Sequence, residues 1–341
     1  MRGFLFPGSR SEMTETAPVL VLLVHFRTPT EAVRCLHSLA GQRAELPGLE
    51  AVVWDNCSGS ELLAPLKQAR EENGWQDWLT IEVSERNLGF GAGNNAVLRP
   101  RLEAGSLPEH IMLLNPDTEV QPGALAELLR FQQAHPDAAF VGPATCSRPP
   151  QVDGTAFRFP GLISHLVEGA RWGLLDRLFA RWRVSLPVQQ EAHRADWVSG
   201  GAVMIQRRVF EQIGLFDESF FLYFEETDLS YRAAKQGLES WYNPKALVYH
   251  FAGAATGLGR AEGPSPRTPG YWFASRQHYY RKRYGVTLTW LADLAYVLLR
   301  GFWQLVARLT GRRRAGDAPH FLSDFAAWNL LGRRWEGPRG A

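Results

Sequence analysis

The chain has 341 residues, of which 45% are hydrophobic and 21% are charged. This composition is typical of a folded globular protein and excludes a largely disordered chain. The formal net charge is only +2, so the sequence does not predict a general nucleic-acid-binding protein. Three cysteines, none closely paired or at metal-type spacing, exclude a disulfide scaffold and a cysteine-based zinc site.

Residues 1–17 are expected to form a flexible tail. They lack the sustained apolar stretch of a secretory signal. After the tail, short apolar runs that end in polar residues alternate with helical segments. Strands are predicted at 19–24, 50–54, 79–83 and 110–114, with helices at 28–39 and 60–73 and a third after the glycine-rich segment 86–95. This alternation predicts an α/β domain that binds its ligand at the carboxyl ends of the strands.

The amino-acid composition changes in the middle of the chain. Residues 160–190 are rich in Leu, Trp and Arg and are expected to form a helical insertion. A Gly-Gly pair and a strand follow at 197–205, and another strand-like run is Ala246–Tyr249. The Gly- and Pro-rich segment 257–270 is predicted to be a loop, and 275–284 a basic aromatic helix.

Residues 287–309 predict an amphipathic helix rather than a membrane span. Asp293, Arg300, Gln304 and Arg308 fall on one face of this helix, and the opposite face is apolar. Two interpretations stay open. The helix packs on the protein core, or it lies in the membrane interface with Arg312–Arg314 on anionic lipid.

Two acidic motifs are candidates for chemistry. Asn115-Pro116-Asp117 directly follows a predicted strand, where Asp117 would hold a divalent cation, although Asn-Pro-Asp is also an ordinary turn. Glu225, Glu226 and Asp228 lie close together after an apolar aromatic run, and such surroundings raise a carboxylate pKa toward that of a general base. The alternative is a solvated helix N-terminus, where acids are also favoured.

Taken together, the ordered motifs closely resemble those of family 2 glycosyltransferases, and most of all the bacterial rhamnosyltransferase-like branch. The resemblance covers about residues 18–285, and seven motifs carry it. They are Val24–Phe26, Trp54–Ser58, Asn87–Asn94, Asn115–Asp117, Gly200–Gly201, Phe224–Leu229 and Tyr249–His250. The family implies a GT-A fold, which is a Rossmann-like α/β/α sandwich, with residues 286–341 as an amphipathic helical appendage.

The resemblance also implies a role for each matched position. Asp55 would accept a hydrogen bond from the pyrimidine of the donor nucleotide, and the main chain near His25 and Phe26 would frame the same base. Asp117 and His250 would bind Mg²⁺ or Mn²⁺, with Asp117 and Glu119 as an alternative acidic pair. The other implied donor-nucleotide residues are Asn87, Gly89, Asn94, Asn95 and Asn115.

The catalytic base implied by the family is Glu226, with Glu225 as the alternative. Gly200, Gly201 and Asp228 would lie at the donor and acceptor sugars, although Asp228 is equally open to a role in supporting its helix. The implied reaction is inverting transfer of a sugar, L-rhamnose from dTDP-L-rhamnose in this branch, to a cell-surface polysaccharide or lipid-linked glycan precursor. The alternatives are a UDP-hexose or UDP-N-acetylhexosamine donor and, from another class, a sugar nucleotidyltransferase. A cytoplasmic enzyme at the inner face of the cell membrane is expected.

Overall fold

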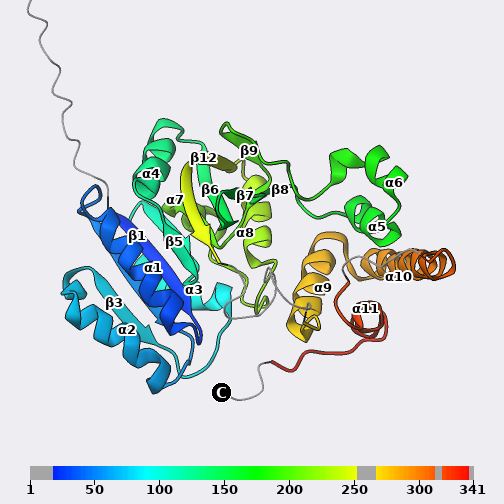
Figure 1. Ribbon diagram of the computed structural model, residues 1–341, viewed down its shortest axis with the longest axis horizontal. Coiled ribbons are helices and arrows are strands. Elements are labelled where there is room, and N and C mark those ends of the chain that lie inside the picture. The colour runs from blue at the N-terminus through cyan, green and yellow to red at the C-terminus, as the bar shows by residue number, and fades with distance from the viewer. Residues whose placement is uncertain (1–17, 252–265, 312–316, 338–341) are drawn as a thin grey trace, which may run out of the picture.

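The computed structural model describes residues 18–251, 266–311 and 317–337 (Figure 1). The predicted tail, Arg312–Arg314 and most of the predicted loop at 257–270 lie outside the described residues.

A mixed sheet runs through the first 250 residues. Its order is β3-β2-β1-β4-β11-β6-β12-β5, and the first four of these strands are parallel. Strand β11 then runs antiparallel to β4. The strands are β1 Val19–His25, β2 Leu49–Asp55, β3 Leu79–Val83, β4 His110–Leu114, β5 Thr118–Val120, β6 Ala138–Arg148, β11 Ala202–Gln206 and β12 Glu239–His250. Short strands flank them: β7 Gln151–Asp153 pairs with β6, β9 His193–Ala195 with β12, and β8 Ala156–Phe157 with β10 Trp197–Val198.

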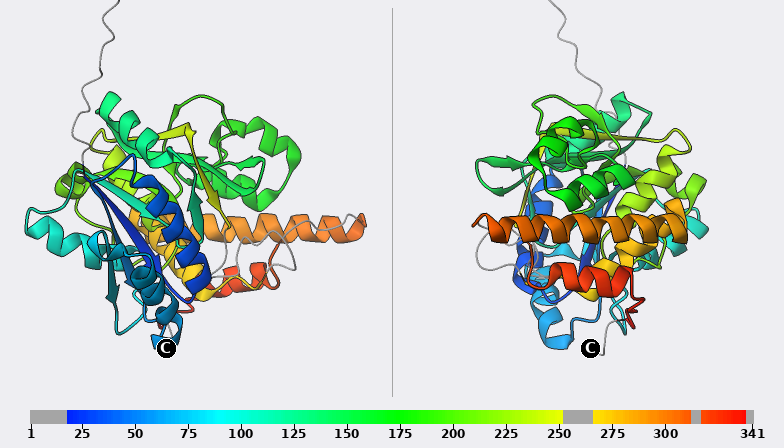
Figure 2. Two further views of the ribbon diagram at one scale, coloured as in Figure 1. Left: turned by 60° about the vertical axis from the view of Figure 1, so that its left-hand side comes forward. Right: turned by 90° about the vertical axis from the view of Figure 1, so that its right-hand side faces the viewer.

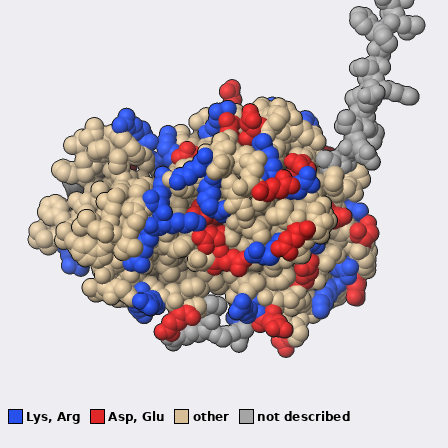
Figure 3. All heavy atoms as spheres, turned by 180° about the vertical axis from the view of Figure 1, so that it is seen from behind, with Lys and Arg blue, Asp and Glu red and all other residues tan. Residues whose placement is uncertain are grey.

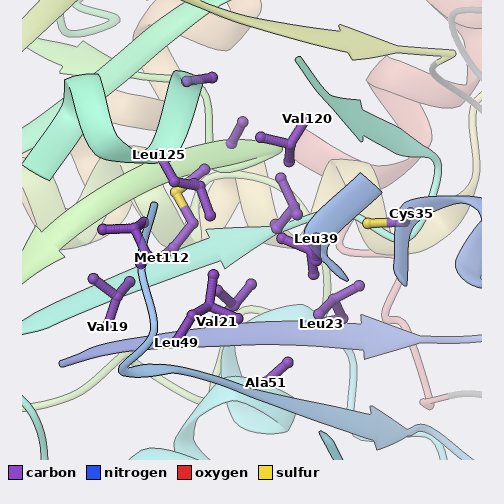
Figure 4. Close-up of a cluster of buried hydrophobic side chains, with 14 of the residues drawn as sticks. Val19, Val21, Leu23, Cys35, Leu39, Leu49, Ala51, Met112, Val120 and Leu125 are labelled. Atoms are coloured by element: carbon purple, nitrogen blue, oxygen red, sulfur yellow. The ribbon is translucent and has the colours of Figure 1, made fainter. Parts of the chain in front are cut away.

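Side chains alternate between the two faces of the sheet along each strand, so a strand that is apolar throughout makes both faces apolar. Helices cover both faces. In β1, Val19, Val21 and Leu23 join one buried cluster with α1 (Figure 4), whereas Leu20 and Leu22 join a second cluster with α3. The helices of this α/β layer are α1 Pro29–Gln42, α2 Ser60–Glu72, α3 Phe90–Glu103, α4 Ala124–Ala134, α7 Arg207–Ile213 and α8 Glu225–Ala234, with a short 3₁₀ turn η1 at Trp75–Asp77.

The structure confirms the predicted α/β class. The strand predicted at 197–205 is interrupted, because the turn at Ser199–Gly201 separates β10 from β11. Sequence analysis missed β6 and α4. The small residues and the proline of β6, in Ala138–Ala144, give little of the β-branched signal that marks a strand.

Five further helices form a separate helical lobe beside the sheet. They include the predicted insertion and pack mainly on one another, with α10 against α5, α9 and α11 (Figure 2). Their bounds are α5 Leu162–Ala170, α6 Gly173–Leu178, α9 Gly270–Tyr284, α10 Val286–Leu309 and α11 Phe321–Asn329, with the 3₁₀ turn η2 at Ala180–Trp182.

Helix α10 packs on its neighbours through its polar face. Asp293 and Arg300 are both only 1% exposed, whereas Leu298 and Phe302 on the other side are largely in solvent. The expected helix is present, but the face that packs is the opposite of the one an amphipathic pattern normally buries. In the part of the chain that the structure describes, no helix is long and apolar enough to cross a membrane.

A buried charge network explains this orientation. Arg276 on α9 donates to Asp293 at 2.8 Å and to His165 on α5, and Arg300 donates to Asp317 at 3.2 Å. Burial, followed by the nearby charge of Arg276, lowers the pKa of His165 to about 4, so its ring is neutral and can accept from Arg276. The network joins the insertion to the C-terminal helices.

Removing Asp293 is therefore expected to destabilise the protein. Asp293→Ala leaves the buried Arg276 without its counter-charge, and breaking such a pair costs about 3–5 kcal/mol. Asp176→Ala is the control, because it removes an ion pair with Arg183 in which both side chains are about half exposed, worth at most about 1 kcal/mol. Denaturant unfolding measures both changes, and equal effects would contradict the assigned role of Asp293.

Candidate functional site

The carboxyl ends of β1 and β2 are tied by a buried His–Asp pair. His25 Nδ1 lies 2.7 Å from Asp55 Oδ1, and the backbone N–H of Thr28 donates to His25 Nε2. Because Nε2 accepts, Nδ1 carries the proton and donates to Asp55. The second carboxylate oxygen of Asp55 accepts from the Ser58 backbone at 3.0 Å.

Asp55 is therefore already engaged on both oxygens. Burial raises its pKa, but the hydrogen bonds from His25 and Ser58 outweigh burial and leave the pKa below its usual range. The predicted contact between Asp55 and a pyrimidine stays a prediction. Phe26, next to His25, is only partly buried, and so a base could stack there.

The glycine-rich segment forms a tight turn into α3. The Asn87 side chain accepts from the Gly89 backbone at 2.9 Å, and Asn56 bridges from β2 to the Gly89 carbonyl. Gly89 has a φ of +82°, and a Cβ there would lie 1.9 Å from the Phe221 carbonyl oxygen. Glycine is required at this position because both the backbone conformation and the space exclude a side chain.

Gly89→Ala is accordingly expected to destabilise the fold by about 2–4 kcal/mol, the sum of a left-handed backbone and local overpacking. Gly59→Ala is a matched control, because Gly59 also has a positive φ, of +95°, but open space around its missing Cβ. The unfolding midpoint should fall clearly further for Gly89→Ala. Equal shifts would show that the contact with Phe221 contributes nothing.

The two asparagines of α3 face the protein interior. The Asn95 amide donates to the Phe216 carbonyl and to Glu218, and its oxygen accepts from the Phe216 backbone. Asn94 donates back to the Phe90 carbonyl, and its own oxygen is buried without a hydrogen-bond partner. The structure thus gives Asn95 a role in holding the loop before α8, and leaves one unsatisfied acceptor on Asn94.

Asn115, Asp117 and His250 come together where β4 ends and β12 ends. His250 Nε2 lies 3.3 Å from Asp117 Oδ1 and 3.3 Å from Asn115 Nδ2. Glu119, which the sequence left open as a partner of Asp117, instead pairs with Arg34 at 3.3 Å. The geometry therefore groups Asp117 with His250 rather than with Glu119.

This pair fits a divalent cation. Two ligand atoms bound at right angles to one ion at about 2.1 Å are about 3 Å apart, close to the observed separation of Asp117 and His250. Among the described residues, no three His, Cys, Asp or Glu side chains gather as a metal cage. A cation held here would need further ligands from a bound molecule, as is common for ions at phosphate sites.

Gly200 and Gly201 lie between the Asp117–His250 pair and the acidic helix α8. A Cβ on Gly201 would lie 2.7 Å from the His250 ring, whereas a Cβ on Gly200 would lie 3.3 Å from Cβ of Glu226. Two adjacent residues without side chains thus separate the His250 imidazole from the Glu226 carboxylate. The predicted metal and base residues lie at one site.

The start of α8 has an unusual backbone. Tyr223 and Phe224 have φ values of +72° and +70°, a conformation that residues other than glycine rarely adopt. Consecutive residues of this kind are characteristic of functional sites, where the surrounding structure sustains the strain. They place Glu225 and Glu226 in the first turn of the helix, and sequence patterns give no signal for such a conformation.

The two glutamates point in different directions. Glu226 lines a cavity, whereas the Cβ of Glu225 packs 3.5 Å from where a Cβ on Gly91 would be, under α3. Burial raises the pKa of Glu226, and backbone N–H groups, including that of Gly200, partly offset this. Burial first, and the charge of Glu226 second, raise the pKa of Glu225 well above its usual value.

Asp228 lies outside this site. Its carboxylate accepts from Arg232 at 2.8 Å and from Lys282 of α9, and it is 3% exposed. The geometry favours the helix-supporting alternative over a contact with sugar. Arg276, in the predicted basic aromatic helix, is bound to Asp293 in the helical lobe.

A cavity of about 340 Å³ opens beside Glu226, between the sheet and the helical lobe. Aromatic residues, most of which the sequence analysis did not single out, supply much of its wall. They come from segments far apart in the chain, so no local motif marks them. The lining includes Phe157, Trp197, Tyr223, Phe224, Trp272, Tyr280, Tyr296, Phe321 and Phe325.

The mixed sheet, with these groups gathered at its strand ends, has the architecture of a GT-A fold. The family model described as "Glycosyltransferase like family 2" matches residues 17–285, and the chain belongs to this family.

Curated relatives match over a shorter region. The N-acetylglucosaminyl-diphospho-decaprenol L-rhamnosyltransferase of Mycobacterium tuberculosis is 31% identical over 182 residues, 50% of this chain and 58% of the relative. The low-salt glycan biosynthesis hexosyltransferase Agl10 of Haloferax volcanii is 30% identical over 225 residues, 64% of this chain and 62% of the relative. The chain thus spans about three fifths of the length of these relatives.

Solved structures share the fold at low identity. GalNAc-T7 with UDP, GalNAc and Mn²⁺ has a TM-score of 0.53 at 17% identity, covering 79% of this chain and 51% of that one. The mannosyltransferase PcManGT of Pyrobaculum calidifontis, with GDP-Man and Mn²⁺, has a TM-score of 0.52 at 15% identity, covering 93% and 84%. Both likenesses confirm the predicted GT-A fold.

Proposed function

We propose that the protein transfers a sugar from a nucleotide diphosphate to an acceptor hydroxyl, with inversion at the anomeric carbon. One observation carries the proposal: the Asp117–His250 pair and Glu226 lie on either side of Gly200–Gly201. A cation site and a carboxylate with a raised pKa, separated by a gap without side chains, suit a reaction in which a diphosphate leaves as a hydroxyl attacks. Family membership favours glycosyl over nucleotidyl transfer.

Asp117 and His250 would hold the cation against the donor diphosphate. The bound ion would neutralise the negative charge that develops on the leaving diphosphate. An imidazole ligand favours Mn²⁺ over Mg²⁺, because Mg²⁺ binds oxygen almost exclusively. Phe26 and the turn at Asn87–Gly89 would border the nucleoside, with Asp55 fixing the strand ends below it.

Glu226 would take the proton of the acceptor hydroxyl. It faces the aromatic cavity, and Trp197 and Trp272 there offer flat apolar surfaces on which a sugar ring can stack. Glu225 is directed away from this cavity, and burial together with the charge of Glu226 raises its pKa well above the usual value. The acceptor would therefore enter from the side of the helical lobe.

For the donor we propose dTDP-L-rhamnose, and for the acceptor a lipid-linked glycan precursor, because one curated relative is named for a diphospho-decaprenol-linked acceptor and L-rhamnose. A UDP-hexose or UDP-N-acetylhexosamine is the second candidate, because another relative is named a hexosyltransferase.

A thermal-shift screen with dTDP-, UDP- and GDP-sugars, each with and without Mn²⁺, tests this function. A donor present at about a hundred times its Kd stabilises the native state by about 2.7 kcal/mol. We expect a stabilisation by dTDP-L-rhamnose that requires Mn²⁺. A shift with UDP-sugars alone would select the second candidate, and no shift with any nucleotide sugar would contradict the proposed function.

A further inference from the structure

The outer face of α10 is apolar over its whole length. From Val286 to Ala307, its only charged residues are Asp293 and Arg300, and both are buried. Most of the side chains directed to solvent are large and apolar, exposed by between 36% and 78%. They are Val286, Leu288, Trp290, Leu291, Leu298, Leu299, Phe302, Leu305 and Leu309. A continuous apolar face of this kind is uncommon on a free protein surface.

The insertion extends this face. Trp172, Leu174 and Leu178, in and beside α6, are each more than 60% exposed. Arg171, just before α6, lies over the Trp303 ring of α10, and Arg300 donates to the Glu168 carbonyl at the end of α5. These contacts hold α5 against α10, and α6 packs next to α5 (Figure 1). We call the exposed apolar residues of α10 and α6 the apolar face.

The margin of the apolar face is basic. Arg177 and Arg181 are exposed beside α6, and Arg308 is exposed in the last turn of α10. The neighbouring acid Asp176 is paired with Arg183. From behind, the helical lobe shows a broad uncharged area with Lys and Arg along its border (Figure 3).

We propose that the apolar face docks on a lipid bilayer that contains anionic lipids. Apolar side chains that insert at the headgroup boundary, surrounded by arginines, are the features of interfacial membrane binding. A symmetric dimer through the same surface fits less well, because it would bring the two basic margins together without anions between them.

Docking in this way would bring the cavity to the membrane. Tyr296 of α10 lines the cavity from the inner side of the same helix whose outer side forms most of the apolar face. An acceptor anchored in the bilayer would then reach Glu226 while its anchor stays in the bilayer. This last step rests on the proposed function; docking itself does not.

Flotation of the full chain with vesicles tests the docking. We expect binding to vesicles of equimolar phosphatidylcholine and phosphatidylglycerol, and weaker binding to phosphatidylcholine alone. The triple variant Leu298→Gln, Phe302→Gln and Leu305→Gln should reduce the bound fraction by at least about tenfold, because each change removes an apolar group from the docking face. Its melting temperature should stay within about 2 °C of the parent, since all three side chains are exposed.

The matched control keeps the same positions apolar, with Leu298→Met, Phe302→Leu and Leu305→Met, and should bind as the parent does. Failure of the parent to bind, or full binding by the glutamine variant, would overturn the proposal. Equal binding to both vesicle types would overturn the role of the basic margin. A dimer that the glutamine changes dissociate, without vesicle binding, would assign the face to a second copy. The vesicles contain no glycan, so failure here leaves sugar transfer untouched.

Discussion

Glu226→Gln is expected to lower the turnover of sugar transfer by about a thousandfold while nucleotide affinity stays nearly unchanged. Positioned general bases contribute roughly 10²–10⁴-fold, and glutamine keeps the size of the side chain but cannot take a proton. Because burial raises the pKa of Glu226, turnover of the parent should rise with pH through a value above that of an ordinary glutamate. Initial rates over a pH series, with nucleotide binding measured by calorimetry, check both parts.

Glu225→Gln is the matched control. The Glu225 side chain is 2% exposed, and its pKa is raised well above the usual value. We therefore expect the Glu225 carboxyl to be protonated, and glutamine closely mimics a protonated glutamate. This variant should keep most of the parent activity. If Glu225→Gln were inactive and Glu226→Gln active, the base would be Glu225. The side-chain orientations would then not identify the catalytic base.

Asp117→Asn should weaken Mn²⁺-dependent nucleotide binding by about a hundredfold or more. Loss of an outer-shell partner alone costs 10–100-fold in metal affinity, and Asp117 supplies the carboxylate that would bind the ion directly. Binding measured in EDTA should change little, because the substitution keeps the shape of the side chain. Calorimetric titration of the nucleotide with and without Mn²⁺ separates the two contributions.

The control for this change is Glu119→Gln, which removes a carboxylate two residues away that is paired with Arg34 and directed away from His250. It should bind nucleotide and Mn²⁺ as the parent does. If Glu119→Gln lost metal dependence as Asp117→Asn does, the alternative pair of Asp117 with Glu119 would regain support. If Asp117→Asn kept metal dependence, the Asp117–His250 site would be wrong.

The first four strands could be predicted from sequence because each is a short apolar run ending at a polar residue. Val19–Val24 and His110–Leu114 are buried on both faces, so their pattern is continuous. Strand β6 could not be found in this way. Its burial comes from its central place between β11 and β12, which is a property of the assembled sheet.

The candidate site was predictable as a set of residues but not as an arrangement. Asp117, His250 and Glu226 were singled out by position after strands or within an acidic motif, and the structure brings them to one place. Hydrogen bonds to Asp55 and Asn95 come in part from residues far away in sequence, His25 and Phe216 respectively. The aromatic cavity depends on packing between the sheet and the helical lobe, which no single segment encodes.

The sequence pattern identified the two faces of α10 but left open which of them packs on the protein. The ion pairs of Asp293 and Arg300 decide the orientation and bury the polar face. Periodicity identifies the two faces of a helix, and the partners determine which one turns inward.

The Arg276–Asp293 ion pair has a consequence for where the enzyme can be cut. The family match ends at residue 285, but Arg276 lies before that point and its counter-charge lies after it. A shortened chain ending at 285 would keep Asp117, His250 and Glu226 but would lose the counter-charge of Arg276 and the wall of the cavity formed by Tyr296 and Phe325. The evolutionary boundary of the family and the folding boundary of this molecule therefore do not coincide.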